Sequence, residues 1–245
     1  MKPCHPNEAF AREVERNIAG MREDTDLQAA GRLLLRSASP HKPAYNFRWM
    51  GRPIIQLPTD MVAMQEIIWQ VRPDVVVECG VAHGGSILYY ASILQLLGAG
   101  EVVGVDVDIR PHNRAAIEDH PMAARVRLIE GSSIDPATVA RVRAIVGERR
   151  AIVVLDSNHT HDHVLAELRA YAPMVCMGGY CVVMDTLVED MPDSFFDDRP
   201  WGVGNNPKTA VRQFLAEDGR FEVDRDTESK LLLTVAPEGY LRRVA

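Results

Sequence analysis

One glycine-rich segment carries the first residues with evident chemical use. It covers residues 78–86, reads ECGVAHGGS and directly follows a run of valines. Such a turn before a helix presents free backbone N–H groups to a ligand. Its glycines lack the G-x-G-x-x-G spacing of dinucleotide-binding proteins, and a carboxylate at Glu78 would repel a pyrophosphate. That carboxylate suits the ammonium of an amino-acid-like ligand such as S-adenosylmethionine (SAM). We therefore expect Glu78, Gly80, Gly84 and Ser86 to bind this cofactor.

Further polar positions follow the next two β-branched runs. Asp106 ends the second run, where an acidic residue can accept hydrogen bonds from ribose hydroxyls. Ser132, Ser133 and Asp135 follow the third run and could flank an adenine ring. Each feature alone is equally compatible with a tight turn or a solvated acid. Their order and spacing together favour a SAM site.

Two aspartates, Asp156 and Asp185, end the fourth and fifth runs. If these strands are parallel neighbours, both carboxylates project into one crevice, and paired carboxylate oxygens suit a hard cation such as Mg²⁺. A cation there could bind substrate hydroxyls and lower the pKa of one of them near the methyl donor. We expect both residues to be metal ligands, with Asp156 also beside the cofactor.

A histidine cluster follows Asp156 in the segment DSNHTHDH. His159 is the candidate general base, because an imidazole with an ordinary pKa of about 6.5 can remove a hydroxyl proton near neutral pH. His161 and His163 are expected at the surface or at a helix N-terminus. An alternative interpretation takes His159 and His163 as an i, i+4 helical pair that binds zinc with Asp156 or Asp185, as in a metallohydrolase. Without an H-E-x-x-H or H-x-D pattern, zinc and iron are less favoured than Mg²⁺.

An alternation of short strands and helices must position these residues. Val/Ile-rich runs between helix-like stretches indicate strands buried on both faces, which is typical of a doubly wound, mostly parallel α/β sheet. Strands are expected at 75–79, 101–105, 126–129, 151–155 and 180–184, and helices at 86–97, 111–120, 136–146, 162–171 and 207–216. Two last strands, 221–223 and 231–235, are joined by the short link DRDTESK, which predicts an antiparallel C-terminal hairpin. This is the Rossmann-like arrangement of class I methyltransferases.

The N-terminal part of the chain predicts a cover for this sheet. Apolar residues at helical spacing within 8–36 predict one or two amphipathic helices, which could contact the core or a partner subunit. An aromatic and turn-rich stretch follows, and then a helix whose N-cap is expected at Thr59 or Asp60. We expect two regions: an N-terminal helical extension with an aromatic cover segment at 1–58, and a methyltransferase domain at 59–245.

Composition and charge exclude several classes of protein. The 245 residues include 27 basic and 34 acidic ones, a net charge of -7, whereas nucleic-acid-binding chains normally carry a basic surplus. A hydrophobic content of 47% is average for a globular chain. No segment has the pattern of a membrane span or a secretory signal. We expect a cytoplasmic protein without nucleic-acid or membrane partners, whose four cysteines, Cys4 among them, are structural thiols.

A long acidic and aromatic loop covers residues 186–206. Loops of this length are often lids or binding loops. Trp201, Asn205 and Asn206 could contact a substrate, although a plain surface loop explains them equally well. Lys208, in the next helix, could neutralise a nearby acid.

Several segments resemble one known family. They are the stretch from YNFRWMGRPIIQLP to VVVECGVAHGGS, then LDSNHTHDHVLAEL, PWGVGNNPKTAVRQFL and the closing LLLTVAPEGYLRRV. Over residues 40–244 the chain is similar to the cephalosporin hydroxylase/rhamnosyl O-methyltransferase family. Despite the hydroxylase label, the resemblance implies a class I SAM-dependent methyltransferase with a Mg²⁺ site, acting on sugar hydroxyls of natural products or surface glycans, usually as an oligomer. Its implied SAM contacts are Glu78, Gly80, Gly84 and Asp106, its metal ligands Asp156 and Asp185, and its base His159.

One departure from the family pattern concerns the metal. Members commonly have two adjacent acids after the fifth strand, and here Met184 precedes Asp185. A missing carboxylate implies a weaker, differently coordinated or absent metal. The first hypothesis is a SAM-dependent, Mg²⁺-assisted O-methyltransferase that acts on a hydroxyl of a sugar or natural product, as a homo-oligomer. The alternatives are a metal-dependent hydrolase or hydroxylase, and a non-catalytic SAM-binding partner of an oxygenase.

Overall fold

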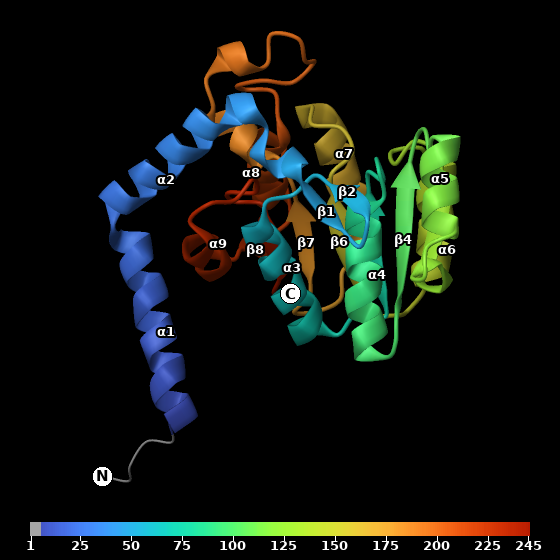
Figure 1. The fold of residues 1–245 in the computed structure, drawn as a ribbon, viewed down its shortest axis with the longest axis horizontal. Helices are drawn as coiled ribbons and strands as arrows, with labels where there is room; N and C mark the ends of the chain where they lie inside the picture. Colours follow the sequence, from blue (N-terminus) through green and yellow to red (C-terminus); the bar gives the residue numbers. More distant parts are fainter. Residues whose placement is uncertain (1–5) are drawn as a thin grey trace.

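A seven-stranded sheet in the order β5-β4-β3-β6-β7-β9-β8 forms the centre of the protein (Figure 1). The computed structural model describes residues 6–245, so Cys4 lies outside the described residues. The first five strands in this order, β5, β4, β3, β6 and β7, are parallel, as predicted. The last two, β9 and β8, pair antiparallel at one edge of the sheet. The strands are β3 (Val75–Cys79), β4 (Glu101–Asp106), β5 (Val126–Glu130), β6 (Ala151–Leu155), β7 (Tyr180–Val183), β8 (Phe221–Val223) and β9 (Tyr240–Arg243).

Helices cover both faces of the sheet, which confirms the doubly wound architecture (Figure 1). Those on one face are α3 (Pro58–Val71), α4 (Gly85–Leu97) and α5 (Pro111–Glu118), and those on the other are α6 (Pro136–Val146), α7 (His161–Tyr171) and α8 (Pro207–Glu217). Successive strand residues point to opposite faces. Val76 and Val154 therefore belong to the first core, and Val77 and Val153 to the second. The uninterrupted valine and isoleucine runs fill both cores at once.

The C-terminal hairpin is antiparallel, but its second strand is not the predicted one. β8 pairs with β9 at the far end of the chain. The predicted strand at 231–235 is wrong, because α9 (Arg225–Leu231) occupies the link and a turn follows it. Asp224 caps this helix by accepting hydrogen bonds from two backbone N–H groups of its first turn. The N-cap at Asp224 and the helix-forming residues Glu228 and Lys230 favour a helix over the strand that the following leucines suggested.

Two helices form the N-terminal extension, as predicted. α1 (Pro6–Glu23) and α2 (Thr25–Ala38) extend along one side of the molecule, away from the sheet (Figure 1). Arg22 joins α1 to α9, since its guanidinium donates to Ser229 Oγ at 3.2 Å and pairs with Asp226.

The aromatic stretch after α2 is an ordered cover over α4. It contains two 3-10 turns, η1 (Ser39–His41) and η2 (Pro43–Asn46), and a hairpin of β1 (Phe47–Trp49) and β2 (Arg52–Ile54). Trp49 packs edge-on against Tyr89 of α4, with ring centroids 4.8 Å apart. A Cβ on Gly85 would lie 2.1 Å from the Pro53 carbonyl oxygen, so only glycine lets the hairpin approach the helix this closely.

Asp60 lies inside α3 and does not cap it. The helix begins at Pro58, whose fixed φ suits the first helical turn, so neither predicted N-cap residue is the cap. The buried Asp60 carboxylate accepts hydrogen bonds from Thr234 Oγ1, from Val235 N at 3.0 Å and from Tyr240 Oη at 2.7 Å. Burial outweighs these bonds and raises the pKa of Asp60 to about 6. The interaction ties α3 to the C-terminal segment that borders the site described below.

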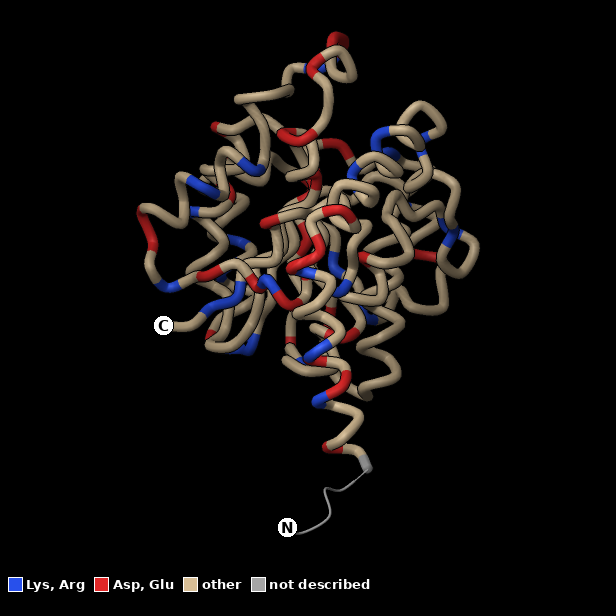
Figure 2. The backbone as a smooth tube through the Cα atoms, turned by 90° about the vertical axis from the view of Figure 1, so that its left-hand side faces the viewer, with Lys and Arg blue, Asp and Glu red and all other residues tan. Residues whose placement is uncertain are grey.

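Charged residues of both signs are mixed over the side of the molecule in Figure 2. Among residues 6–245, no helix combines the length and the apolarity that crossing a membrane requires.

Candidate active site

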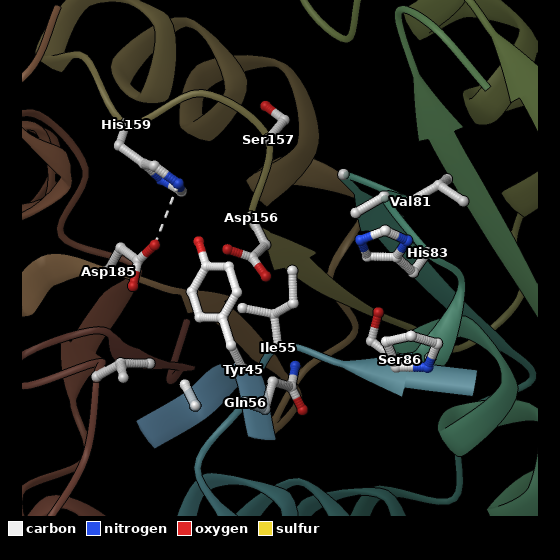
Figure 3. Close-up of a pocket in the computed structure, with 16 residues that line it drawn as sticks. Tyr45, Ile55, Gln56, Val81, His83, Ser86, Asp156, Ser157, His159 and Asp185 are labelled. Carbon is white, nitrogen blue, oxygen red and sulfur yellow. Dashed lines mark ion pairs between the residues drawn. The ribbon is translucent and has the colours of Figure 1, made fainter. Parts of the chain in front are cut away.

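The carboxyl ends of β3, β6 and β7 bring the predicted residues to one edge of the sheet. Gly80, Asp156 and Asp185 follow these three neighbouring parallel strands. A cavity of about 260 Å³, which we call the site cavity, lies at this edge (Figure 3). Ser86 and His159 also line it. Five of the predicted site residues, Gly80, Ser86, Asp156, His159 and Asp185, thus line one cavity, whereas Glu78 and Gly84 do not line it.

Asp156, His159 and Asp185 form one cluster of possible metal ligands. One ligand atom from each side chain can be chosen so that all three atoms lie within 4.8 Å of one another. His159 Nε2 lies 3.1 Å from Asp185 Oδ2 (Figure 3). Asp185 has a left-handed backbone with φ of +55°, which aspartate tolerates better than most residues. The extended backbone of β7 therefore ends just before Asp185.

The two carboxylates of this cluster lie near the His159 imidazole, but no permanently charged basic side chain is among the described residues that line the site cavity. Burial and the nearby carboxylates of Asp185 and Glu78 raise the pKa of Asp156 well above its usual range. A site that concentrates carboxylate oxygens without compensating charge favours a bound cation.

His159 is held between an acid and an aromatic ring. Besides Asp185, it contacts Trp201 edge-to-face, with ring centroids 4.8 Å apart at an interplanar angle of 87°. α7 begins only at His161, so His159 and His163 are not a helical i, i+4 pair. His163 lies instead 3.0 Å from Ser133 Oγ. The zinc pair of the hydrolase interpretation is therefore wrong, and the expectation that His161 and His163 lie at a helix N-terminus is confirmed.

Gly80 allows the glycine-rich turn to lie against the end of β6. Its φ is +104°, and a Cβ there would be 2.1 Å from the Asp156 carbonyl oxygen. The backbone of the turn can therefore pass directly beside the cluster only if this residue is glycine. Gly84, by contrast, is the N-cap of α4, and a Cβ there would meet Ile117.

Buried acceptor oxygens lie beside this turn. Glu78 is fully buried, and its Oε2 accepts a hydrogen bond from Ser86 Oγ at 2.9 Å. Burial raises the pKa of Glu78 to about 8. Gln56, which lines the site cavity, donates from Nε2 to Tyr90 Oη at 3.1 Å. Within the described part of the chain, Glu78 Oε1 and Gln56 Oε1 have no hydrogen-bond donor. Orphaned acceptors of this kind suit a ligand that brings N–H donors.

The residues expected at the ribose and adenine do not line the site cavity. The Asp106 carboxylate accepts hydrogen bonds from Val81 N at 2.8 Å and Ala82 N at 3.2 Å, so it holds the glycine-rich turn. Ser133 is buried against His163, and Ser132 and Ser133 do not line the site cavity. Their contacts to a cofactor remain predictions.

The N-terminal cover supplies residues that sequence reasoning missed. Tyr45 and Gln56 line the site cavity, and Figure 3 shows the Tyr45 hydroxyl directed toward Asp156 and Asp185. The aromatic residues of this stretch were the only sequence feature that could have pointed to a role at the site. Its long-range docking on α4, which brings it to the cavity, was not visible in the sequence.

The long loop at 186–206 is hydrogen-bonded to the start of α7, close to the cluster. Asn205 Oδ1 accepts a hydrogen bond from His161 N at 2.9 Å, and Asn206 caps α8. Lys208 Nζ binds Asp190 Oδ2 at 2.5 Å, so the expected neutralisation of an acid is confirmed.

Met184, which stands where family members commonly have an acid, is 1% exposed. Its side chain packs in the first core, together with residues of α3 and α4. His159 takes the third place in the cluster beside the two aspartates.

The fold defines a class. A parallel five-stranded core with an antiparallel C-terminal pair and a ligand cavity at its carboxyl edge is a Rossmann-like methyltransferase fold. A solved structure of CmcI with Mg and SAM has a TM-score of 0.58 and 19% identity, over 82% of this chain and 78% of that chain. An O-methyltransferase from Bacillus cereus in complex with SAH has a TM-score of 0.53 and 15% identity, over 91% and 92% of the two chains.

The chain belongs to the rhamnosyl O-methyltransferase/CmcI family, whose model matches residues 41–244. Rhamnosyl O-methyltransferase of Mycobacterium tuberculosis (strain ATCC 25618 / H37Rv) is 32% identical over 80% of this chain and 77% of its own length. The Mycobacterium leprae (strain TN) protein of the same name is 30% identical over 80% and 82%. Family and fold together identify a SAM-dependent O-methyltransferase.

Proposed function

We propose that this chain transfers the methyl group of SAM to a hydroxyl of a sugar or sugar-bearing natural product, with Mg²⁺ at Asp156 and Asp185. One observation carries the proposal: Asp156, His159 and Asp185 converge within 4.8 Å at the edge where the glycine-rich turn lies. Several similar proteins are rhamnosyl O-methyltransferases, which supports a sugar as the acceptor.

Residues that line or border the site cavity fit SAM at its amino-acid end. Glu78 Oε1 and Gln56 Oε1 are the orphaned acceptors, and a bound ammonium would provide the missing donors. Ser86 Oγ, at the start of α4, already bonds Glu78 and can adjust toward a carboxylate near the helix N-terminus. We assign Glu78, Gly80 and Ser86 to this end of the cofactor.

The cluster residues fit Mg²⁺ better than a softer metal. Asp156 and Asp185 supply hard carboxylate oxygens as ligands, which leaves the His159 imidazole free to act as a base. Mg²⁺ bound there would lower the pKa of an acceptor hydroxyl and help to orient it.

His159 is the base in the reaction that we propose. The acceptor oxygen gives its proton to the imidazole and attacks the methyl carbon. A new O–C bond forms while the C–S bond breaks, and that electron pair goes to sulfur, which becomes a neutral thioether. Asp185 orients the imidazole and stabilises its protonated form through the 3.1 Å contact. The edge-to-face contact with Trp201 also restricts the ring.

We also infer that the chain forms a homo-oligomer through its helical extension and functions in the cytoplasm. Phe10 is 66% exposed, Leu33 64% and Leu34 56%, so the two helices of the extension offer large apolar side chains that a second copy of the chain could cover. Cys79, Cys176 and Cys181 are free thiols, which agrees with a reducing compartment. Light scattering of the protein and of a Leu33→Glu, Leu34→Glu variant tests the association, and fractionation of cells tests the location.

A methyl-transfer assay tests the function. Purified protein, SAM and rhamnosides are incubated with Mg²⁺ or with EDTA, and products are detected by a mass increase of one methylene. The proposal expects a methylated rhamnoside with Mg²⁺ and little with EDTA. Hydrolysis products without methylation would instead support the hydrolase alternative.

A further inference from the structure

Side chains from two neighbouring elements hold the glycine-rich turn at its carbonyl oxygens. Arg52, the first residue of β2, donates to the His83 carbonyl oxygen from Nε at 3.0 Å and from Nη2 at 2.8 Å. Asn113 of α5 donates from Nδ2 to the Ala82 carbonyl oxygen at 2.9 Å. Arg52 Nη2 also donates to Asn113 Oδ1 at 2.8 Å, so the two side chains form one hydrogen-bonded unit. We call this pair the arginine clamp.

The same turn is also held at its backbone N–H groups. Asp106 accepts hydrogen bonds from Val81 N and Ala82 N, and Gly84 N donates to the Val81 carbonyl oxygen at 2.7 Å. The turn needs this support, because Ala82 has a φ of +44°, a left-handed conformation that alanine adopts only against a steric cost. The arginine clamp therefore completes a set of contacts that defines the conformation of the turn.

Burial and charge make the arginine clamp stronger than an ordinary surface contact. Asn113 is 3% exposed and Arg52 is half-buried. Within residues 6–245, the hydrogen bonds of Arg52 end on carbonyl and amide oxygens and not on a carboxylate. Hydrogen bonds from a charged donor are stronger than those between neutral groups, and the planar guanidinium donates in fixed directions. This arginine thus spends its charge on holding backbone.

The arginine clamp joins the two parts of the chain that are assigned to the amino-acid end of SAM. One part is the glycine-rich turn, whose His83 lines the site cavity. The other is the segment after the β1–β2 hairpin, where Gln56 follows the end of β2 by two residues. Glu78 before the turn and Gln56 after the hairpin each carry one of the orphaned acceptors. Arg52 bridges these two parts and so fixes how far apart the acceptors lie.

We propose that Arg52 and Asn113 are positioning residues for SAM, which hold the glycine-rich turn and the β1–β2 hairpin in the arrangement that binds the cofactor. This inference rests on the proposed function, because it takes the turn as part of the SAM site. Neither side chain lines the site cavity, so both act through the turn and take no part in methyl transfer itself. Loss of the arginine clamp should therefore weaken SAM binding and leave the chemical step unchanged.

Calorimetric SAM titrations of three variants test the arginine clamp as a unit. Arg52→Met keeps an unbranched side chain without the charged donor, and Asn113→Ala removes the bridging amide. Each should weaken SAM binding about tenfold, the size expected when hydrogen bonds to a charged group are lost. The double variant should bind SAM no more than about twofold more weakly than either single variant, because both residues act through one network. Effects that multiply to about a hundredfold would show independent action and would overturn the proposal.

Two further variants serve as a partial rescue and a matched control. The ammonium of Arg52→Lys can donate to the His83 carbonyl oxygen but lacks the fork that also reaches Asn113, so its SAM affinity should lie between those of the wild type and Arg52→Met. Arg48→Met removes an exposed arginine of β1 in the same hairpin and should bind SAM like the wild type. Equal weakening in Arg48→Met and Arg52→Met would overturn the proposal. The Arg52 variants decide the outcome by themselves where Asn113→Ala does not fold.

Kinetics and hydrogen exchange separate positioning from a general loss of structure. With a rhamnoside as acceptor, Arg52→Met should raise the KM for SAM about tenfold and change kcat at saturating SAM by less than about twofold. Deuterium uptake of the ligand-free variant should increase in the peptide that contains residues 80–86 and stay unchanged in β6. A lower kcat with an unchanged KM for SAM, or faster exchange throughout the sheet, would contradict the positioning role.

The outcomes distinguish this inference from the proposed function. A wild type that binds SAM and methylates a rhamnoside, together with an Arg52→Met variant of equal SAM affinity, would retain the function and overturn the arginine clamp. A wild type that binds no SAM would overturn both. Weaker SAM binding in Arg52→Met with partial recovery in Arg52→Lys supports the arginine clamp even where no rhamnoside is methylated.

Discussion

His159 Nε2 lies 3.1 Å from Asp185 Oδ2, although the two residues are 26 positions apart and follow different strands. β6 and β7 are parallel neighbours, so the chain returns to the same edge of the sheet after each of them. The pair combines an imidazole with a carboxylate that can orient it. This relationship is the basis for the proton transfer that we assign to His159.

Replacing the proposed base, His159, should lower the rate of methyl transfer without weakening SAM binding. We expect His159→Ala to lower kcat by about 10²–10⁴-fold, the range for general bases. Its SAM affinity should change by less than about twofold, because the imidazole is assigned to the acceptor and not to SAM. Kinetics and calorimetry measure the two effects, with His112→Ala on the exposed face of α5 as the matched control. Full activity of His159→Ala would remove the residue from the mechanism.

Removing one carboxylate should weaken metal binding and stabilise the metal-free protein. In Asp156→Asn we expect Mg²⁺ affinity to fall at least about tenfold, since even supporting residues of metal sites have effects of this size. The metal-free variant should be more stable, because burial and, after it, repulsion from Asp185 disfavour the charged Asp156 carboxylate and raise its pKa. Metal titration and denaturant unfolding test both effects, and Asp198→Asn on the exposed loop is the control. Unchanged Mg²⁺ affinity contradicts the assignment.

The buried Glu78 should make the stability of the ligand-free protein depend on pH. Burial raises its pKa from 4.5 to about 8, so the folded protein holds this proton more tightly than the unfolded chain. The stabilisation is complete below pH 4.5 and is lost as the pH rises toward 8. The full change is on the order of 5 kcal/mol, at 1.36 kcal/mol per pKa unit.

Glu78→Gln isolates this contribution. The glutamine stays neutral and can still accept from Ser86, so unfolding free energies between pH 5 and 8 should become flatter than in the wild type. SAM binding should weaken, because the negative charge assigned to its ammonium is lost. Glu148→Gln, at an exposed position, should keep the wild-type pH dependence. A wild-type slope in Glu78→Gln would mean that another group carries the effect.

Alanine substitutions at two glycines distinguish the cost of a left-handed backbone from the cost of a steric clash. Gly80 and Gly98 have φ of +104° and +83°, but only at Gly80 would a Cβ collide with another backbone, at 2.1 Å from Asp156 O. Gly98→Ala should cost about 1–2 kcal/mol for the left-handed backbone alone. Gly80→Ala should cost several kcal/mol in total and should weaken SAM binding. Equal losses of stability in the two variants, measured by denaturant unfolding, would contradict the close approach.

Local patterns were enough to predict the sheet and the strand-end residues. Val75–Cys79 and Ala151–Leu155 are apolar on both faces except at Glu78, and the position of a residue at the end of a buried parallel strand fixes where it lies. Asp156, Asp185 and the nearby His159 were therefore predictable as a group. Residue chemistry suggested their roles as metal ligands and base, and the family resemblance implies the same roles.

Features that depend on tertiary contacts were not predictable in the same way. The strand expected at 231–235 does not form: α9, capped by Asp224, fills the link and ends at Leu231, and residues 232–235 are neither helix nor strand. Asp60 resembled an N-cap, and only the folded chain brings Tyr240 to its carboxylate. Tyr45 reaches the site because the β1–β2 hairpin docks on α4, a contact that no local pattern encodes.

Calorimetric titration of the purified protein with SAM, with and without Mg²⁺, tests the central claim most directly. The account predicts binding at micromolar concentrations with one SAM per chain under both conditions, because the cofactor contacts are assigned to Glu78, Gly80 and Ser86 and not to the metal. Absence of binding under both conditions would mean that the glycine-rich segment is only a turn, and it would contradict the assignment of this cavity to methyl transfer.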